Sequence, residues 1–132
     1  MALQIMILRE ELELNIIIGL DIGGSTTKII GLNGQDLIGM ILVRASDPVA
    51  SAYGAFGRFI SDHNLDLSDI SRVMVTGVGS SYLKSPLLGI NTIRLPEFMA
   101  IGLGGLFVSG LPEAVVVSMG TGTAVVRAVQ AA

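Results

Sequence analysis

The chain has 132 residues, of which 51% are hydrophobic and 14% charged, and it carries a formal net charge of −3. This length corresponds to one domain that can bury a core. Because the net charge is negative and Lys and Arg do not cluster, we expect no nucleic-acid partner. The sequence contains no cysteine, which excludes disulfides, thiolate zinc sites and cysteine-ligated iron–sulfur clusters in this chain.

The apolar segments are interrupted too often to cross a bilayer, so we expect no membrane partner. Residues 1–14 are interpreted as an N-terminal extension. They do not resemble a secretory signal, because charged residues interrupt them and no small-residue cleavage site follows. We therefore expect a cytoplasmic protein. The interrupting charges are Arg9, Glu10, Glu11 and Glu13.

The most informative stretch runs from Asn15 to Gly31 and reads NIIIGLDIGGSTTKIIG. An apolar run typical of a buried strand leads to Asp21, a Gly-Gly pair, three hydroxylated residues and Lys28. Glycine permits positive φ angles and close approach of a ligand, so we expect two strands joined by a tight turn. Successive N–H groups of such a turn can bind an anion, and Asp21 is placed to hold a hydrated Mg²⁺ beside it. An ordinary hairpin with a capping Asp21 is the alternative.

The next elements follow from turn and cap signals. An Asn-Gly pair at 33–34 predicts a second tight turn, after which residues 37–44 form the third strand of an antiparallel meander. Asp47 as N-cap and Pro48 at the first helical position predict a helix that runs to about His63. His63 is the only histidine, and we expect it to be a surface or capping residue rather than a catalyst.

Residues 72–76 predict a parallel strand, followed by the glycine-rich turn 77–81 at its carboxyl end. Ligands often bind at such positions in open α/β sheets. A further strand is expected at 91–95, and a Pro-Glu pair at 96–97 opens a helix that runs to Gly110. The glycines of this helix lower its helix propensity, so we expect close packing against another backbone in compensation.

The chain closes with a second strand–turn–strand unit, with strands at 114–118 and 124–129 around the turn 120–123. Neither the turn 77–81 nor the turn 120–123 is a dinucleotide fingerprint of the G-x-G-x-x-G type. The third glycine is replaced by Tyr82 in the first turn and by Val125 in the second. A P-loop is excluded as well, since no Gly-Lys dipeptide occurs in the sequence.

Two stretches together resemble a known group of proteins. Asp21-Ile-Gly-Gly-Ser-Thr-Thr-Lys28 and Ser118-Met-Gly-Thr-Gly-Thr123 look like the two phosphate loops of the acetate and sugar kinase, actin and chaperone superfamily. Within it, the order of motifs is most similar to type II (eukaryotic-like) pantothenate kinases. The resemblance covers about residues 16–129. It implies a ribonuclease H-like α/β domain with a mixed sheet, the first three strands antiparallel and helices packed on the sheet.

The resemblance also implies roles for individual residues. Asp21 would be the carboxylate near Mg²⁺, Lys28 a positive group beside the terminal phosphates of ATP, and Glu97 the general base that activates the pantothenate hydroxyl. For Glu97, a helix N-terminal acid stabilised by the helix dipole is the alternative. A solvent-facing turn is the alternative to a substrate pocket around residues 76–80. The first phosphate loop would comprise Gly23, Gly24, Ser25, Thr26 and Thr27, the second loop Gly120, Thr121, Gly122 and Thr123, and the substrate pocket Thr76, Gly77 and Ser80.

In such kinases ATP lies in a cleft between two related domains, and this chain reaches only the start of the second. We therefore divide it into the extension 1–14, an N-terminal kinase domain 15–112 and the first hairpin of a truncated second domain, 113–132. We expect such a chain to bind nucleotide weakly and not to turn over alone. A half-cleft exposes a strand edge and an apolar wall, so we also expect a homodimer.

Three alternatives remain. The activator ATPases of 2-hydroxyacyl-CoA dehydratases share the acidic-glycine opening and a T-G-x-G turn, but they hold an iron–sulfur cluster through cysteines, which this sequence lacks. A sugar kinase of the same superfamily usually has an Asp in an N-D pair before a helix, where this chain has Pro96-Glu97. The third alternative is a non-catalytic, nucleotide-binding or self-associating half-domain, which ATP-dependent activity of the chain would exclude.

Overall fold

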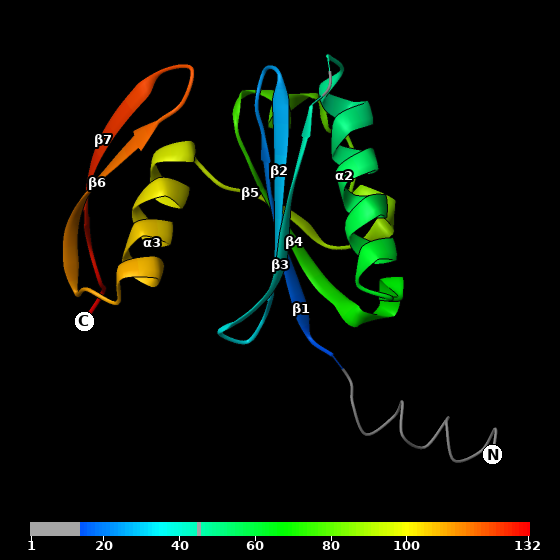
Figure 1. The fold of residues 1–132 in the computed structure, drawn as a ribbon, viewed down its shortest axis with the longest axis horizontal. Helices are drawn as coiled ribbons and strands as arrows, with labels where there is room; N and C mark the ends of the chain where they lie inside the picture. Colours follow the sequence, from blue (N-terminus) through cyan, green and yellow to red (C-terminus); the bar gives the residue numbers. More distant parts are fainter. Residues whose placement is uncertain (1–13, 45) are drawn as a thin grey trace. The chain divides into compact units, whose positions relative to one another are not determined.

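The computed structural model describes residues 14–44 and 46–132. They form two compact units, which divide between Arg94 and Leu95 (Figure 1). The predicted N-terminal extension lies outside the described residues except for Leu14, which packs against the core of the first unit. The division into domains 15–112 and 113–132 stays a prediction; by compactness, residues 95–112 group with the final hairpin.

The first unit is built on a five-stranded mixed sheet with the strand order β3-β2-β1-β4-β5. Strands β1, β2 and β3 form an antiparallel meander, β4 pairs in parallel with β1, and β5 pairs in parallel with β4. The predicted ribonuclease H-like α/β fold, with its first three strands antiparallel, is confirmed. The strands are β1 (Ile16–Ile22), β2 (Thr26–Asn33), β3 (Asp36–Arg44), β4 (Ile70–Thr76) and β5 (Thr92–Arg94).

Helix α2 (Pro48–Asp62) covers one face of this sheet (Figure 1). Asp47 caps the helix through a side-chain oxygen that accepts the N–H of Ala50 at 2.9 Å, as the Asp-Pro signal predicted. His63 follows the last turn, and its ring Nδ1 lies 2.9 Å from the carbonyl oxygen of Phe59. The predicted capping role of His63 is therefore confirmed.

The core of the first unit lies between α2 and the sheet. Strand side chains alternate between two faces, which we call the α2 face and, on the opposite side, the Asp21 face. Glycine at position 31 is required on the α2 face, because an added Cβ would overlap the ring of Phe59. The buried core residues are Ile16, Ile18, Leu20, Ile22, Ile29, Ala52, Ala55, Phe56, Phe59, Ile70, Val73, Val75, Leu83 and Leu87.

Short 3₁₀ helices supply most of the connections after α2. The first, η1 (Leu67–Asp69), leads into β4, and the other two, η2 (Val78–Tyr82) and η3 (Leu87–Gly89), lie between β4 and β5. The predicted glycine-rich turn at the end of β4 is η2, which Gly77 precedes with φ = +90°.

The second unit consists of one helix and one antiparallel hairpin. Close packing of the glycine-rich helix was predicted against another backbone, but the nearest atoms belong to side chains of the hairpin: Gly105 faces Val116, and Gly102 faces Ala128 and Val126. Neither this helix nor α2 is long and apolar enough to cross a membrane, and the same holds for every helix within 14–44 and 46–132. The elements are α3 (Glu97–Ser109), β6 (Glu113–Met119) and β7 (Thr123–Val129).

Candidate functional site

The turn between β1 and β2 is a short loop whose backbone is partly free. The N–H of Gly23 donates to the carbonyl of Thr26 at 2.8 Å and closes the turn. A Cβ on Gly23 would lie 2.9 Å from that same carbonyl oxygen, so a side chain does not fit there. Gly24 and Ser25 are exposed, and their N–H groups have no partner among the described residues. Two adjacent free N–H groups beside a hydroxyl are suited to bind an anion.

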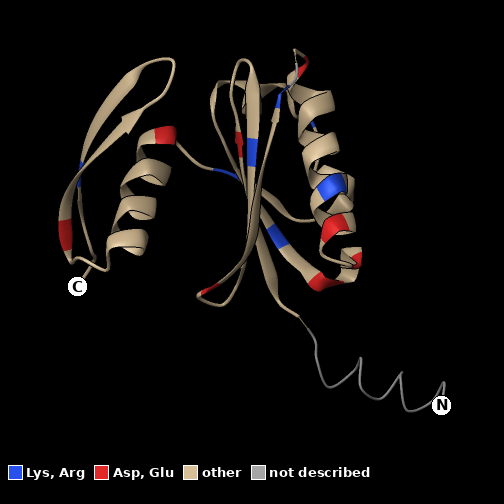
Figure 2. Ribbon diagram, in the orientation of Figure 1, with Lys and Arg blue, Asp and Glu red and all other residues tan. Residues whose placement is uncertain are grey.

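Asp21 and Lys28 face each other beside this loop. They are opposite one another in the β1–β2 ladder, and Lys28 Nζ lies 3.2 Å from Asp21 Oδ2. Their side chains are 38% and 59% exposed, respectively, so both groups are accessible to a ligand. Charged residues are few and dispersed on the described chain (Figure 2), where only two further ion pairs are found.

Thr27 has a different environment from its neighbours. Its side chain points to the α2 face and is fully buried, and its hydroxyl lies 2.6 Å from Ser51 Oγ. The hydroxyl was expected to help the phosphate loop, but it is used to join β2 to α2. Of the three predicted loop hydroxyls, those of Ser25 and Thr26 therefore remain.

The end of β4 adds a second set of residues next to Asp21. Thr76 pairs with Asp21 across the parallel ladder, and its Oγ1 is buried without a hydrogen-bond partner in the described part of the chain. Gly77 follows with φ = +90°, and a Cβ there would lie 2.6 Å from Asp21 Oδ1 and would overlap the backbone of Ile22. Ser80 is buried and donates its hydroxyl to the Gly77 carbonyl at 2.7 Å. The hydroxyl of Ser80 thus stabilises the turn. The substrate-binding role of Thr76, Gly77 and Ser80 stays a prediction.

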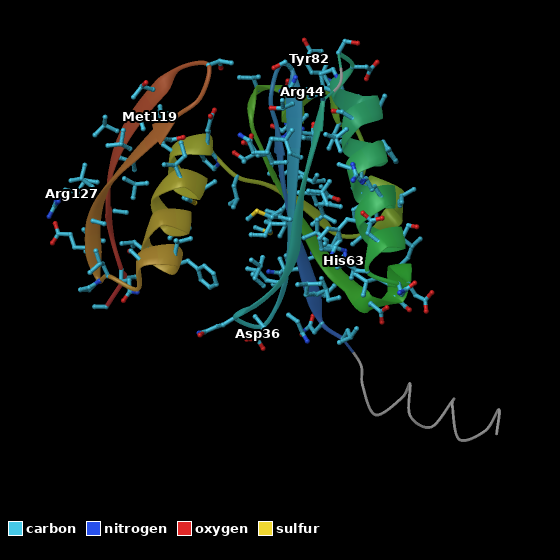
Figure 3. All side chains as sticks on the ribbon, in the orientation of Figure 1. Asp36, Arg44, His63, Tyr82, Met119 and Arg127 are labelled. Carbon is cyan, nitrogen blue, oxygen red and sulfur yellow. The ribbon has the colours of Figure 1, made fainter. Side chains whose placement is uncertain are left out.

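Arg44 was missed by the sequence analysis. It is the last residue of β3 and pairs with Thr26 at the mouth of the loop, and alternation places it on the Asp21 face with Lys28. Figure 3 shows Arg44 at one end of the first unit and Asp36 at the other. The Arg44 side chain is exposed and forms no ion pair within residues 14–44 and 46–132. The register between β2 and β3 is the signal that identifies it.

The second unit carries the other predicted site residues. Glu97 is the first residue of α3, and its side chain is exposed and makes no hydrogen bond or ion pair with the described residues. In the turn between β6 and β7, the N–H of Gly120 donates to the carbonyl of Gly122 at 2.8 Å. Thr121 and Thr123 are exposed there. The start of α3 and this turn lie at the same end of the second unit (Figure 1).

The acidic residues fit a hydrated metal ion rather than an enclosed one. Nowhere in the described chain do three or more His, Cys, Asp or Glu side chains gather to hold a metal. Mg²⁺ keeps several waters and binds proteins through one or two carboxylates together with phosphate oxygens. Asp21 supplies one accessible carboxylate, and the unpartnered hydroxyl of Thr76 next to it can hydrogen-bond a metal-bound water.

No family model matches the chain, and neither does any curated protein. Solved structures match its fold. The activator of the 2-hydroxyisocaproyl-CoA dehydratase from Clostridium difficile, with bound ADPNP, is 22% identical with a TM-score of 0.60, over 70% of this chain and 33% of the activator. The Acidaminococcus fermentans (R)-2-hydroxyglutaryl-CoA dehydratase component A is 20% identical with a TM-score of 0.58, over 76% of this chain and 38% of that protein.

A sugar kinase matches equally well. The ROK hexokinase from Thermus thermophilus is 15% identical with a TM-score of 0.63, over 86% of this chain and 46% of the hexokinase. The chain therefore spans between 33% and 46% of the length of these three proteins. At these identities the likeness is one of fold, and the fold is that of actin-like ATPase domains.

Proposed function

We propose that the chain binds the terminal phosphates of Mg·ATP at the β1–β2 turn and belongs to a phosphotransferase. The observation that carries this proposal is the accessible Asp21 carboxylate beside the free N–H groups of Gly24 and Ser25. Lys28 and Arg44 add two positive charges on the same face of the sheet. Phosphoryl transfer needs mainly positioning and charge neutralisation, which such a set of groups can supply.

Each group has a part in the proposed site. When bound, Mg²⁺ would neutralise charge on the phosphate oxygens, and Asp21 would hold it through its waters. The N–H groups of Gly24 and Ser25 and the hydroxyl of Thr26 donate to phosphate oxygens. Lys28 leaves its ion pair with Asp21 and binds the phosphates instead. Gly77 leaves room for the Asp21 carboxylate, since a Cβ there would lie 2.6 Å from Asp21 Oδ1.

For the acceptor we propose pantothenate, with Glu97 as the general base that accepts the proton of its hydroxyl. An exposed carboxylate without a partner in the described chain is available for proton transfer. The turn Gly120–Thr123 is proposed as a second phosphate loop, by analogy with the β1–β2 turn. If Glu97→Gln leaves the rate of phosphopantothenate formation in a catalytically complete protein unchanged, the assignment of the base is wrong.

The nucleotide site is tested by calorimetric titration of the full chain with Mg·ADPNP. Asp21→Ala is expected to weaken binding at least tenfold, on the order of the loss of one charged contact or more. Asp36→Ala is the matched control, because Asp36 is an exposed carboxylate at the opposite end of the sheet (Figure 3). Equal affinities of the two variants would overturn the site, and so would the absence of binding by the unmodified chain at millimolar nucleotide.

A second candidate is an ATPase that transfers no phosphoryl group to an organic acceptor. Two of the similar structures, an activator and a component A, belong to 2-hydroxyacyl-CoA dehydratases. The 132 residues contain no cysteine, so they cannot themselves hold an iron–sulfur cluster through thiolates. Formation of phosphopantothenate together with ADP would support the kinase, whereas ADP and inorganic phosphate alone would support the ATPase. A non-catalytic half-domain, whether nucleotide-binding or self-associating, would form neither product.

A further inference from the structure

A pocket of about 290 Å³ lies within the first unit, beside the ends of β4 and β5. It opens on the α2 face of the sheet, because Val75 and Arg94 are paired with each other and Val75 is part of the core under α2. Asp21 and Thr76 point to the other face, so this pocket is not part of the proposed nucleotide site. Its lining residues are Val75, Leu83, Lys84, Ser85, Pro86, Thr92 and Arg94.

The pocket has two cations and no acid. Lys84 and Arg94 are exposed at its rim, none of its lining residues is acidic, and neither cation forms an ion pair with a described carboxylate. Two unneutralised positive charges around one concavity favour an anion.

Arg94 is held in place by two backbone carbonyls. Its Nη2 donates to the carbonyls of Ser80 at 2.7 Å and Leu83 at 3.1 Å, which anchors the guanidinium to η2 and the segment after it. A guanidinium has five N–H groups, so those of Nη1 and Nε remain to donate to a ligand. Lys84 uses one N–H for the carbonyl of Ser81 at 3.2 Å and keeps two. Fixed donors cost less conformational entropy when a ligand binds.

The floor of the pocket is apolar. Val75 and Leu83 are 2% and 8% exposed, and Pro86 is a further apolar residue of the lining. Ligand pockets usually span roughly 300–1,000 Å³, and this one, at about 290 Å³, lies just below that range, which suits a small ligand. An apolar floor under a basic rim matches a molecule with a compact hydrocarbon body and one charged end.

We propose that this pocket binds a small organic carboxylate with a branched aliphatic body. Its carboxylate accepts hydrogen bonds from Arg94 and Lys84, and its aliphatic body contacts Val75, Leu83 and Pro86. Charge-assisted hydrogen bonds of this kind are stronger than neutral ones, and they supply the preference for an acid over its neutral amide. The site is independent of the proposed function.

The test uses the full, ¹⁵N-labelled chain with 3-methylbutanoate as the probe and 3-methylbutanamide as its neutral match. The acid is expected to shift the backbone N–H signals of residues 83–85 and 92–94. We expect 3-methylbutanamide to bind roughly tenfold more weakly than the acid, or more weakly still. Lys84→Met and Arg94→Gln are each expected to weaken binding of the acid by a similar factor. Arg58→Met, which removes an exposed cation from α2, is the control that leaves binding unchanged.

Several results would overturn the proposal. These are equal responses to the acid and the amide, shifts that persist in Lys84→Met, and the absence of shifts at millimolar probe. A stronger response to inorganic phosphate than to the acid would overturn the carboxylate assignment. Lys84→Met keeps the test decisive if Arg94→Gln disturbs the segment that Arg94 anchors. Asp21→Ala is expected to retain acid binding, so failure of the nucleotide site and failure of this pocket are separate results.

Discussion

Lys28 Nζ lies 3.2 Å from Asp21 Oδ2, and the two residues are opposite each other in the β1–β2 ladder, near the turn that joins these strands. The pair is exposed to solvent, so its contribution to the stability of the fold is small, at most about 1 kcal/mol. Its position beside free backbone N–H groups matters more, because both partners can turn to a phosphate and its metal ion.

Lys28→Met is therefore expected to weaken Mg·ADPNP binding severalfold while it changes the free energy of unfolding by less than about 1 kcal/mol. Calorimetry and urea unfolding of the full chain measure the two quantities. Arg58→Met is the matched control, since Arg58 also pairs with an exposed carboxylate, at 3.4 Å from Asp62, but on α2. If the two variants bind nucleotide equally well, Lys28 has no part in the phosphate site.

Thr27→Val is expected to show the opposite pattern to Lys28→Met, with a loss of stability and unchanged nucleotide binding. The hydroxyl of Thr27 is buried against Ser51 Oγ at 2.6 Å, and valine keeps the shape of the side chain without that hydrogen bond. Ser51 still donates to the carbonyl of Pro48, so we expect a loss of about 1 kcal/mol in unfolding free energy rather than the larger cost of an orphaned group. Nucleotide affinity is expected to stay the same. A Thr27→Val, Ser51→Ala double-mutant cycle isolates the coupling between the two hydroxyls.

Local chemistry predicted the elements of the first unit because their signals are contained in a few adjacent residues. The Asp47-Pro48 pair specifies a helix start by capping geometry and a fixed φ angle, and the structure has the cap in place. The Asn33-Gly34 pair specifies a tight turn in the same way, with Gly34 at φ = +62°. Neither signal depends on the rest of the chain.

The parts that could not be predicted depend on register and on contacts between distant segments. Arg44 reaches the mouth of the loop through the β2–β3 pairing, whose register shifts between Gly31 and Leu32. The direction of Thr27 depends on which face of the sheet α2 covers. The pocket around Arg94 is formed partly by residues between 3₁₀ helices, and segments so short carry no hydrophobic periodicity to recognise.

Gly77→Ala is expected to damage both stability and nucleotide binding. At φ = +90° and ψ = 163°, Gly77 lies in a region that only glycine populates freely, and the strain alone costs about 1–3 kcal/mol. The new methyl group would also meet the Asp21 carboxylate and displace it. Gly89→Ala is the control, because Gly89 has φ = +76° but open space around it. It should lose only about 1–2 kcal/mol and keep its affinity for Mg·ADPNP. Equal affinities in the two variants would mean that Gly77 does not position Asp21.

Two neighbouring glycines of α3 allow a matched test of the second unit. Both lie inside the helix, where replacing glycine by alanine usually stabilises by about 1 kcal/mol. A Cβ on Gly104 would meet nothing, whereas one on Gly105 would overlap the side chain of Val116 on β6. Gly104→Ala is therefore expected to slow hydrogen exchange of the α3 amides. Gly105→Ala is expected to accelerate hydrogen exchange in both α3 and the β6–β7 hairpin, because it lowers the free energy of opening by about 1–3 kcal/mol.

The hairpin is the part of this test that discriminates. Gly105→Ala combined with Val116→Ala should recover part of the protection, because the smaller side chain leaves room for the added methyl group. If Gly105→Ala protects the helix as well as Gly104→Ala does, the helix does not pack on the hairpin through this glycine. The compensation for its low helix propensity would then lie elsewhere.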